Sequence, residues 1–190
     1  MDLGISDKLK PILEEVTNFI DLEILPLEQE YHAEVEKGDR WAYTERQTEI
    51  LESLKSKAKA KNLWNFFLTH FEGGHGLNTV EYAYIAEQTG RSHLAPEVFN
   101  CAAPDTGNME VLARYCNEEQ KETWLKPLLA GEIRSAYAMT EPQVASSDAT
   151  NIAMSCVADG DEWVLNGEKI WISGAGAPRC KIMIVMVNTN

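Results

Sequence analysis

The sequence predicts an α+β fold, in which an all-α N-terminal helical domain is followed by the first strands of an antiparallel β-barrel-like domain. Three observations support this prediction. Apolar residues recur at helical spacing through the first two thirds of the chain, a period of two begins near Ile133, and strands do not alternate with helices. The last observation excludes a doubly wound nucleotide-binding fold. The predicted domains are residues 1–132 and 133–190.

Five or six helices are expected in the first domain. An apolar stripe runs from Leu9 to Ile20, and Pro26 should kink or end this first helix. A short helical piece is expected over 99–104, before a helix that Asp105 or Thr106 caps. Three capping boxes and two terminal glycines mark further helix boundaries: Thr44 with Gln47, Asn78 with Glu81, Asn117 with Gln120, Gly90 and Gly131.

The remaining chain is predicted to form strands at 133–139, 152–158, 163–165, 168–172 and 181–187. Residues 159–161 are typical of a turn. Asn166-Gly167, between two β-prone runs, predicts a hairpin that would bring Trp171, Ile172 and Ser173 to a strand end. The sequence stops at Asn190, directly after a strand. This favours a fragment, because open strand edges make a poor independent domain.

Composition limits the classes of partner. Thirty acidic and seventeen basic residues give a net charge of −13, so no nucleic-acid partner is expected. The longest apolar run, 182–187, is strand-sized, so no membrane span is predicted. The N-terminus resembles neither a signal nor a transit peptide, and a cytoplasmic location is expected. A mitochondrial or peroxisomal location stays open for a eukaryotic protein.

Metal and disulfide sites are not predicted. The four cysteines are unevenly spaced without a C-x-x-C pair, so reduced and mostly packed thiols are expected. His70 and His75 allow a metal-site interpretation, but the glycines between them favour an irregular loop.

The candidate site begins at Tyr137 and continues through a loop of small and hydroxylated residues. The strand breaks at Glu141-Pro142, because proline fixes its own φ and biases the preceding residue away from helix. Hydroxyls and N–H groups of the loop can donate to oxygens such as those of a pyrophosphate. Trp171 offers a π face to a flat heterocycle such as a flavin. Taken alone, the loop is more typical of a surface turn, and Trp171 of a core or edge tryptophan.

The two stretches together resemble the acyl-CoA dehydrogenase family. Thr140-Glu141-Pro142, residues 145–148 and Trp171-Ile172-Ser173 follow its usual forms T-E-P-G-A-G-S-D and W-I-T-N/S-G. The loop is closest to the subgroup of family members 10 and 11, which reads T-E-P-x-V-A-S-S-D-A-T-N-I. Further matches at 72–74, 81–83, 87–91 and 103–112 extend the resemblance over nearly the whole chain.

The resemblance implies a bound FAD and a set of residues that contact it: Tyr137, Ala138, Met139, Thr140, Ser146, Ser147, Trp171, Ile172 and Ser173. Ser147 would also lie near the CoA part of the substrate. Gln143-Val144-Ala145-Ser146 replaces the usual Gly-Ala-Gly with one extra residue, so both serines are included. The resemblance places the catalytic base beyond Asn190, assigns no catalytic residue here, and gives Glu141 a structural role.

The implied reaction is α,β-dehydrogenation of an acyl-CoA thioester in fatty-acid oxidation. Electrons would pass to an electron-transferring flavoprotein, and the full-length protein would form a homo-oligomer. Two alternatives remain. An acyl-CoA oxidase or flavin monooxygenase-like relative would consume oxygen with acyl-CoA, and a truncated, non-catalytic helical interaction module would have no helical bundle or candidate base encoded beyond Asn190.

Overall fold

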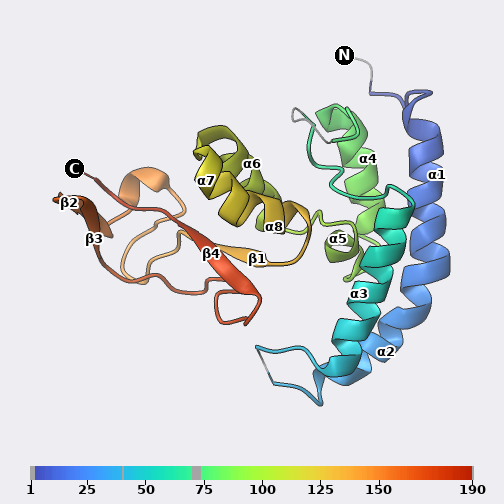
Figure 1. The fold of residues 1–190 in the computed structure, drawn as a ribbon, viewed down its shortest axis with the longest axis horizontal. Helices are drawn as coiled ribbons and strands as arrows, with labels where there is room; N and C mark the ends of the chain where they lie inside the picture. The colour runs from blue at the N-terminus through green and yellow to red at the C-terminus, as the bar shows by residue number, and fades with distance from the viewer. Residues whose placement is uncertain (1–2, 40, 70–73, 190) are drawn as a thin grey trace. The chain divides into compact units, whose positions relative to one another are not determined.

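The structure is a computed structural model that describes residues 3–39, 41–69 and 74–189. The chain divides into two compact units, residues 1–106 and 107–190. The described parts of the first unit form helices and loops, whereas the second unit adds strands after its helices (Figure 1). The predicted α+β fold class is confirmed.

The first unit begins with a long helix that contains one wider turn. It consists of α1 (Leu9–Phe19), the π-helical turn η1 (Ile20–Ile24) and α2 (Leu25–Val35). In η1 the Leu25 N–H donates to the Ile20 carbonyl, five residues back. Proline has no N–H, and its ring clashes with the carbonyl four residues earlier, so a wider turn just before Pro26 accommodates it. The helix does not end at Pro26, as one of the two predicted alternatives had it, but continues to Val35 after the wider turn.

The other helices follow their capping signals closely. They are α3 (Glu45–Ala60), α4 (Thr79–Thr89), α5 (Ala95–Val98), α6 (Asp105–Tyr115), α7 (Glu118–Gln120), η2 (Lys121–Leu125) and α8 (Lys126–Leu129). All three predicted capping boxes are present, with both reciprocal hydrogen bonds. Gly131 ends α8 with φ 69°, whereas Gly90 ends α4 at φ −64°. The helix expected over 99–104 is wrong in place: α5 precedes it, and Asn100 has φ 54°, which a helix does not allow.

The core of the first unit is built on aromatic and aliphatic side chains from α1, η1, α3 and the segments after α3 and α5. The rings of Phe19 and Phe66 lie 5.5 and 5.9 Å from that of Phe99, with Phe66 and Phe99 fully buried. The α1 stripe is confirmed, because Leu9, Val16 and Phe19 are all buried. These contacts hold the helices together through apolar burial.

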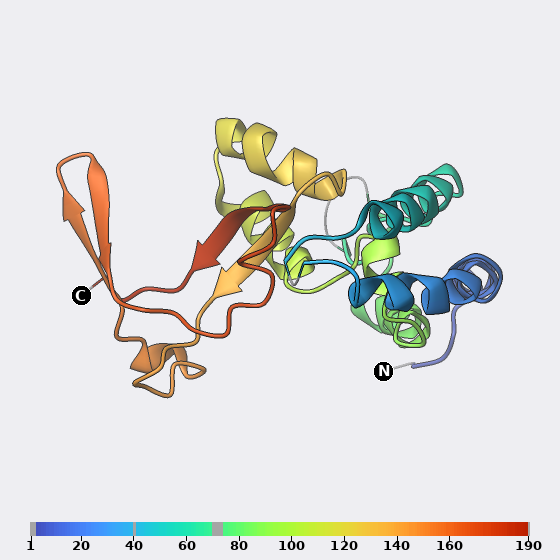
Figure 2. The ribbon, with the colours of Figure 1, turned by 90° about the horizontal axis from the view of Figure 1, so that it is seen from below.

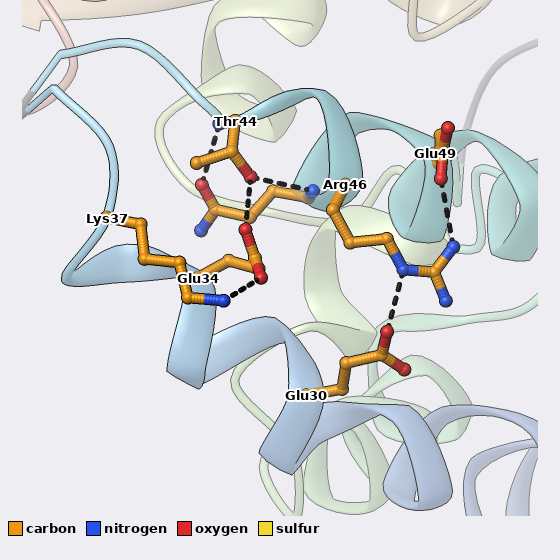
Figure 3. Close-up of polar contacts among 7 residues, drawn as sticks. Glu30, Glu34, Lys37, Thr44, Arg46 and Glu49 are labelled. Atoms are coloured by element: carbon orange, nitrogen blue, oxygen red, sulfur yellow. Dashed lines mark hydrogen bonds and ion pairs between the residues drawn. The ribbon is translucent and has the colours of Figure 1, made fainter.

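A polar network joins α2 to the start of α3 at the surface (Figure 3). The Arg46 guanidinium lies 2.7 Å from Glu30 and 2.9 Å from Glu49. Glu34 accepts from Lys37 at 2.6 Å and from the Thr44 hydroxyl at 3.2 Å. Hydrogen bonds from these cations lower the pKa of both Glu30 and Glu34. The network fixes where α3 begins relative to α2.

The second unit carries two separate strand pairs (Figure 2). Strand β1 (Arg134–Ala138) pairs in parallel with β4 (Cys180–Val185), and β2 (Ser155–Asp159) pairs antiparallel with β3 (Glu162–Asn166). Antiparallel pairing was expected throughout and holds only for the second pair. The amide of Asn108 in α6 donates to the Ser135 hydroxyl and the Ala136 carbonyl, which attaches that helix to β1.

Among the described residues, no helix has both the length and the apolar content needed to cross a bilayer.

All four cysteines carry free thiols, and burial raises the pKa of Cys101 to about 11. Cys101 is therefore protonated at neutral pH.

Candidate cofactor-binding site

The site is built where β1 ends and the chain turns away from the sheet. Residues 139 and 140 follow β1 directly, and their carbonyls face the segment just before Trp171. The Lys169 ammonium donates to the Met139 carbonyl at 3.0 Å, and the Ile170 N–H donates to the Thr140 carbonyl at 2.9 Å. Two stretches thirty residues apart in the sequence therefore lie side by side.

Glu141 is the most highly connected carboxylate of this region. Its oxygens accept from the backbone N–H groups of Ala153 and Met154, both at 2.9 Å, and from Lys169 at 2.8 Å. The side chains of Glu141 and Lys169 are only 3% and 8% exposed. The hydrogen bond from Lys169 and the two backbone donors lower the pKa of Glu141 to about 2. Glu141 therefore carries a negative charge at neutral pH.

The loop after Glu141 is stabilised by its own side chains. The Ser146 hydroxyl is buried and accepts from the Glu141 N–H at 2.6 Å, whereas Ser147 is exposed. Asp148 accepts from the N–H and hydroxyl of Thr150 at 3.0 and 2.7 Å and caps the short 3-10 helix η3 (Ala149–Asn151). The hydroxyl bond is the main cause of the lowered pKa of Asp148. Ser147 is the more accessible of the two candidate serines.

The predicted hairpin at Asn166-Gly167 is wrong. The hairpin turn lies instead at Gly160-Asp161, between β2 and β3, within the turn expected at 159–161. Residues 168–172 form no strand, and the Lys169 ammonium and the Ile170 N–H bond instead to the turn after β1. The segment thus leaves β3 and runs to that turn.

Trp171 does not reach a strand end as predicted, and it does not lie in a core. It is 84% exposed and has φ 54°, an uncommon backbone conformation for a bulky residue. Ile172 is half-buried and Ser173 is exposed. Neighbouring residues 172–175 form a turn in which the Ala175 N–H donates to the Ile172 carbonyl. The indole face is therefore uncovered beside the turn after β1.

The predicted contact residues differ in accessibility. Tyr137 is 38% exposed, Met139 and Thr140 are half-buried, and Ala138 is 4% exposed with its carbonyl accepting from the Met186 N–H. The uncovered groups include aromatic faces and hydroxyls, a set that suits a flat heterocycle with a polar edge.

The sequence interpretation missed Lys169, which bonds to Glu141 and to the Met139 carbonyl. Its position two residues before Trp171 was the available signal.

His75 makes its contacts within the first unit. His75 Nε2 is 3.0 Å from the Trp64 carbonyl, and its ring packs 4.6 Å from that of Phe66. His70 lies outside the described residues. Over the ranges that the structure describes, His, Cys, Asp and Glu side chains form no group of three suited to a metal ion.

Two domain families match the chain almost end to end. The N-terminal domain of acyl-CoA dehydrogenases matches residues 6–132, and the middle domain of acyl-CoA dehydrogenases matches residues 136–190. The two matches are consecutive: a helical domain is followed by a β-domain, and both are domains of one class of dehydrogenase. The chain belongs to the acyl-CoA dehydrogenase family.

Individual relatives agree with this assignment. The chain is 47% identical to mouse acyl-CoA dehydrogenase family member 10 over 98% of its length, and 50% identical to human family member 11 over 96%. It spans only 18% and 23% of these two proteins. The predicted resemblance to this subgroup is confirmed.

Solved structures give the same fold. A structure assigned as an acyl-CoA dehydrogenase from Mycobacterium abscessus is 51% identical, with a TM-score of 0.86, over 96% of this chain and 46% of that one. An acyl-CoA dehydrogenase from Bacillus anthracis, complexed with FAD, is 28% identical with a TM-score of 0.62, over 97% of this chain and 29% of that one.

Proposed function

We propose that this chain forms part of the FAD site of an acyl-CoA dehydrogenase that acts on acyl-CoA thioesters in fatty-acid oxidation. The observation that carries the proposal is the attachment of the Thr140 turn to the segment before Trp171, through the Ile170 N–H and the Thr140 carbonyl at 2.9 Å. This attachment brings both family motifs to one place. The FAD bound to the related Bacillus anthracis protein supports the choice of cofactor.

In this proposal, the residues at the end of β1 line the flavin ring and the two serines lie near its pyrophosphate. The uncovered Trp171 indole offers a stacking face, and the hydroxyls of Thr140 and Ser173 donate to polar ring atoms. Tyr137, Ala138, Met139 and Ile172 supply the remaining lining, and Ser146 and Ser147 the pyrophosphate contacts. Ser147, which is exposed, also contacts the CoA part of the substrate. When bound, FAD supplies the acceptor for the hydride that leaves the substrate β-carbon.

No residue of this chain is proposed as the base that removes the α-proton. Glu141 is unsuited to that step, because Lys169 and two backbone N–H groups occupy its carboxylate oxygens and hold its pKa at about 2. A general base works best when its pKa lies near the working pH. The geometry therefore gives Glu141 a structural role.

The proposal extends to organisation and partners. The chain comprises a helical domain at 1–132 and part of a middle domain at 133–190. Acyl-CoA is the substrate, an electron-transferring flavoprotein accepts the electrons, the full-length protein forms a homo-oligomer, and its location is cytoplasmic. The proposed substrate, electron acceptor and oligomer follow the family assignment and concern the whole protein, of which the chain spans a part.

Titration of the purified protein with FAD tests the proposed site. Thr140→Ala and Ser173→Ala should each weaken FAD binding about fivefold, because each removes one hydrogen bond worth about 1 kcal/mol. Thr123→Ala is the matched control, since its hydroxyl is exposed and donates only to the Glu119 carbonyl. Binding is followed by visible absorbance retained after desalting. An unmodified protein that retains no flavin would contradict the proposed function.

A further inference from the structure

We propose that Glu141 and Lys169 form a positioning pair, which holds the Thr140 turn and the Trp171–Ser173 segment at the separation needed for both to contact one flavin ring. This inference rests on the proposed FAD site. Neither side chain needs to touch the cofactor for this role. The pair acts through the backbone groups to which it is bonded.

Lys169 links two segments. Its ammonium donates to the Glu141 carboxylate at 2.8 Å and to the Met139 carbonyl at 3.0 Å, and both acceptors belong to the turn after β1. Lys169 itself belongs to the other segment, two residues before Trp171. The adjacent Ile170 N–H adds a third bond across the same gap. Two consecutive residues, Lys169 and Ile170, therefore attach the start of the Trp171 segment to the turn after β1.

Glu141 holds the loop that follows the Thr140 turn. It accepts from the backbone of Ala153 and Met154, beyond the serine loop, while its own N–H donates to Ser146 Oγ. One carboxylate therefore closes the loop 142–152 at its base. A shift of Glu141 would move the serine loop and the Thr140 turn together.

The burial of the pair is the reason to assign it a positioning role. Both side chains are less than 10% exposed, and removing two charges from water costs free energy that their attraction only partly recovers. In other proteins, an apolar pair of similar volume often stabilises the fold as well as a buried ion pair does. A buried ion pair instead specifies one geometry, because each charge must meet its donors and acceptors. We therefore attribute the buried charges of Glu141 and Lys169 to positioning of the two segments.

Three variants separate this role from general stability. Lys169→Met removes the link between the segments but leaves the Glu141 bonds to Ala153 and Met154. Since it also leaves a buried carboxylate without its cation, the double variant Glu141→Gln/Lys169→Met is made to avoid a lone charge. Lys169→Arg keeps the charge and tests for rescue. Lys181→Met is the matched control, because Lys181 is exposed on β4.

Each purified variant is measured by FAD affinity, by the visible spectrum of bound flavin, and by hydrogen exchange at the 153, 154 and 170 amides. We expect Lys169→Met and the double variant to weaken FAD at least tenfold and to shift the flavin band. Exchange should accelerate at Ile170, and in Lys169→Met the amides of Ala153 and Met154 should stay protected. Lys169→Arg should recover part of the affinity, and Lys181→Met should match the unmodified protein.

The outcomes distinguish this inference from the proposed function. If the unmodified protein binds FAD and the double variant binds it with the same affinity and spectrum, the positioning role is overturned while the FAD site stands. If the unmodified protein binds no FAD, the proposed function fails and the positioning role fails with it. Weakened binding without faster exchange at Ile170 would also overturn the role, because the segments would then have remained attached.

Discussion

At the scale of single residues, a side chain in this site is best understood from what it bonds to. Glu141 stands in the motif where a catalytic carboxylate could be suspected, yet its oxygens are occupied by Lys169 and two backbone donors. Lys55 is a comparable case in the helical unit. Its side chain is 3% exposed and lies 2.9 Å from Glu52 and 3.2 Å from Glu97. Lys55 and Glu141, one in each unit, are thus buried charges with partners of opposite charge.

The pKa of Glu141 predicts how stability depends on pH. Because folding lowers this pKa from 4.5 to about 2, the ionised carboxylate stabilises the fold fully above pH 4.5, and this contribution is lost as the pH falls toward 2. Glu141→Gln should therefore lose stability at pH 7 and show a weaker fall between pH 4.5 and 2. Urea midpoints across this range provide the measurement. Glu168→Gln, an exposed neighbour, should keep the unmodified slope. Equal slopes for Glu141→Gln and the unmodified protein would contradict the prediction.

At the scale of elements, the helix starts follow from local sequence. Each capping box closes within four residues, so the pattern contains both partners of the two hydrogen bonds. Thr44 is the most connected of the three caps, because its hydroxyl accepts from the Gln47 N–H and also donates to Glu34 in α2. The start of α3 thus depends on one threonine.

Thr44→Ala should lower the free energy of unfolding by about 1 kcal/mol or slightly more, since it removes the cap and the contact to Glu34. Thr48→Ala is the matched control in the same helix. Its exposed hydroxyl donates only to the Thr44 carbonyl. Urea unfolding monitored by circular dichroism measures both. Equal midpoints for Thr44→Ala and Thr48→Ala would contradict the capping role.

The same distinction between local and distant contacts explains what sequence reasoning could predict. The helix starts at the three capping boxes, β1 and the turn at 159–161 were predictable, because their determinants lie within a few residues. The path of 167–173 was not, because bonds to residues 139–141 determine it. Asn166-Gly167 has the local form of a hairpin turn, yet Gly167 has φ 155° and the chain continues away from β3. The motif residues were found by resemblance, and their mutual attachment only by structure.

At the scale of the whole molecule, charge is the dominant property. A net charge of −13 repels other polyanions at long range, so a phosphate-rich ligand must be held by local donors. The hydroxyl and N–H groups of the proposed site are such donors. An extended anionic polymer would meet repulsion over the rest of the surface.

The purified protein should therefore not bind duplex DNA in filter-binding assays, even at low salt, where phosphate contacts are strongest. A basic protein of similar size is the positive control for the assay. Binding that weakens steeply with added salt would contradict this expectation, because such a slope reports neutralised phosphates.

The wider turn η1 also determines the rotation about the helix axis between the buried face of α1 and the buried face of α2. Each α-helical residue advances the side-chain direction by about 100°, so deleting one residue from 20–24 would rotate everything after it by about that angle. Tyr31, which is buried in α2, would turn out of the core while the apolar side of α1 stayed in place. A π-helical turn before a proline thus behaves as an angular spacer. The lengths of α1 and α2 can vary at their outer ends, but the number of residues between Phe19 and Pro26 is fixed by the need for both faces to meet one core.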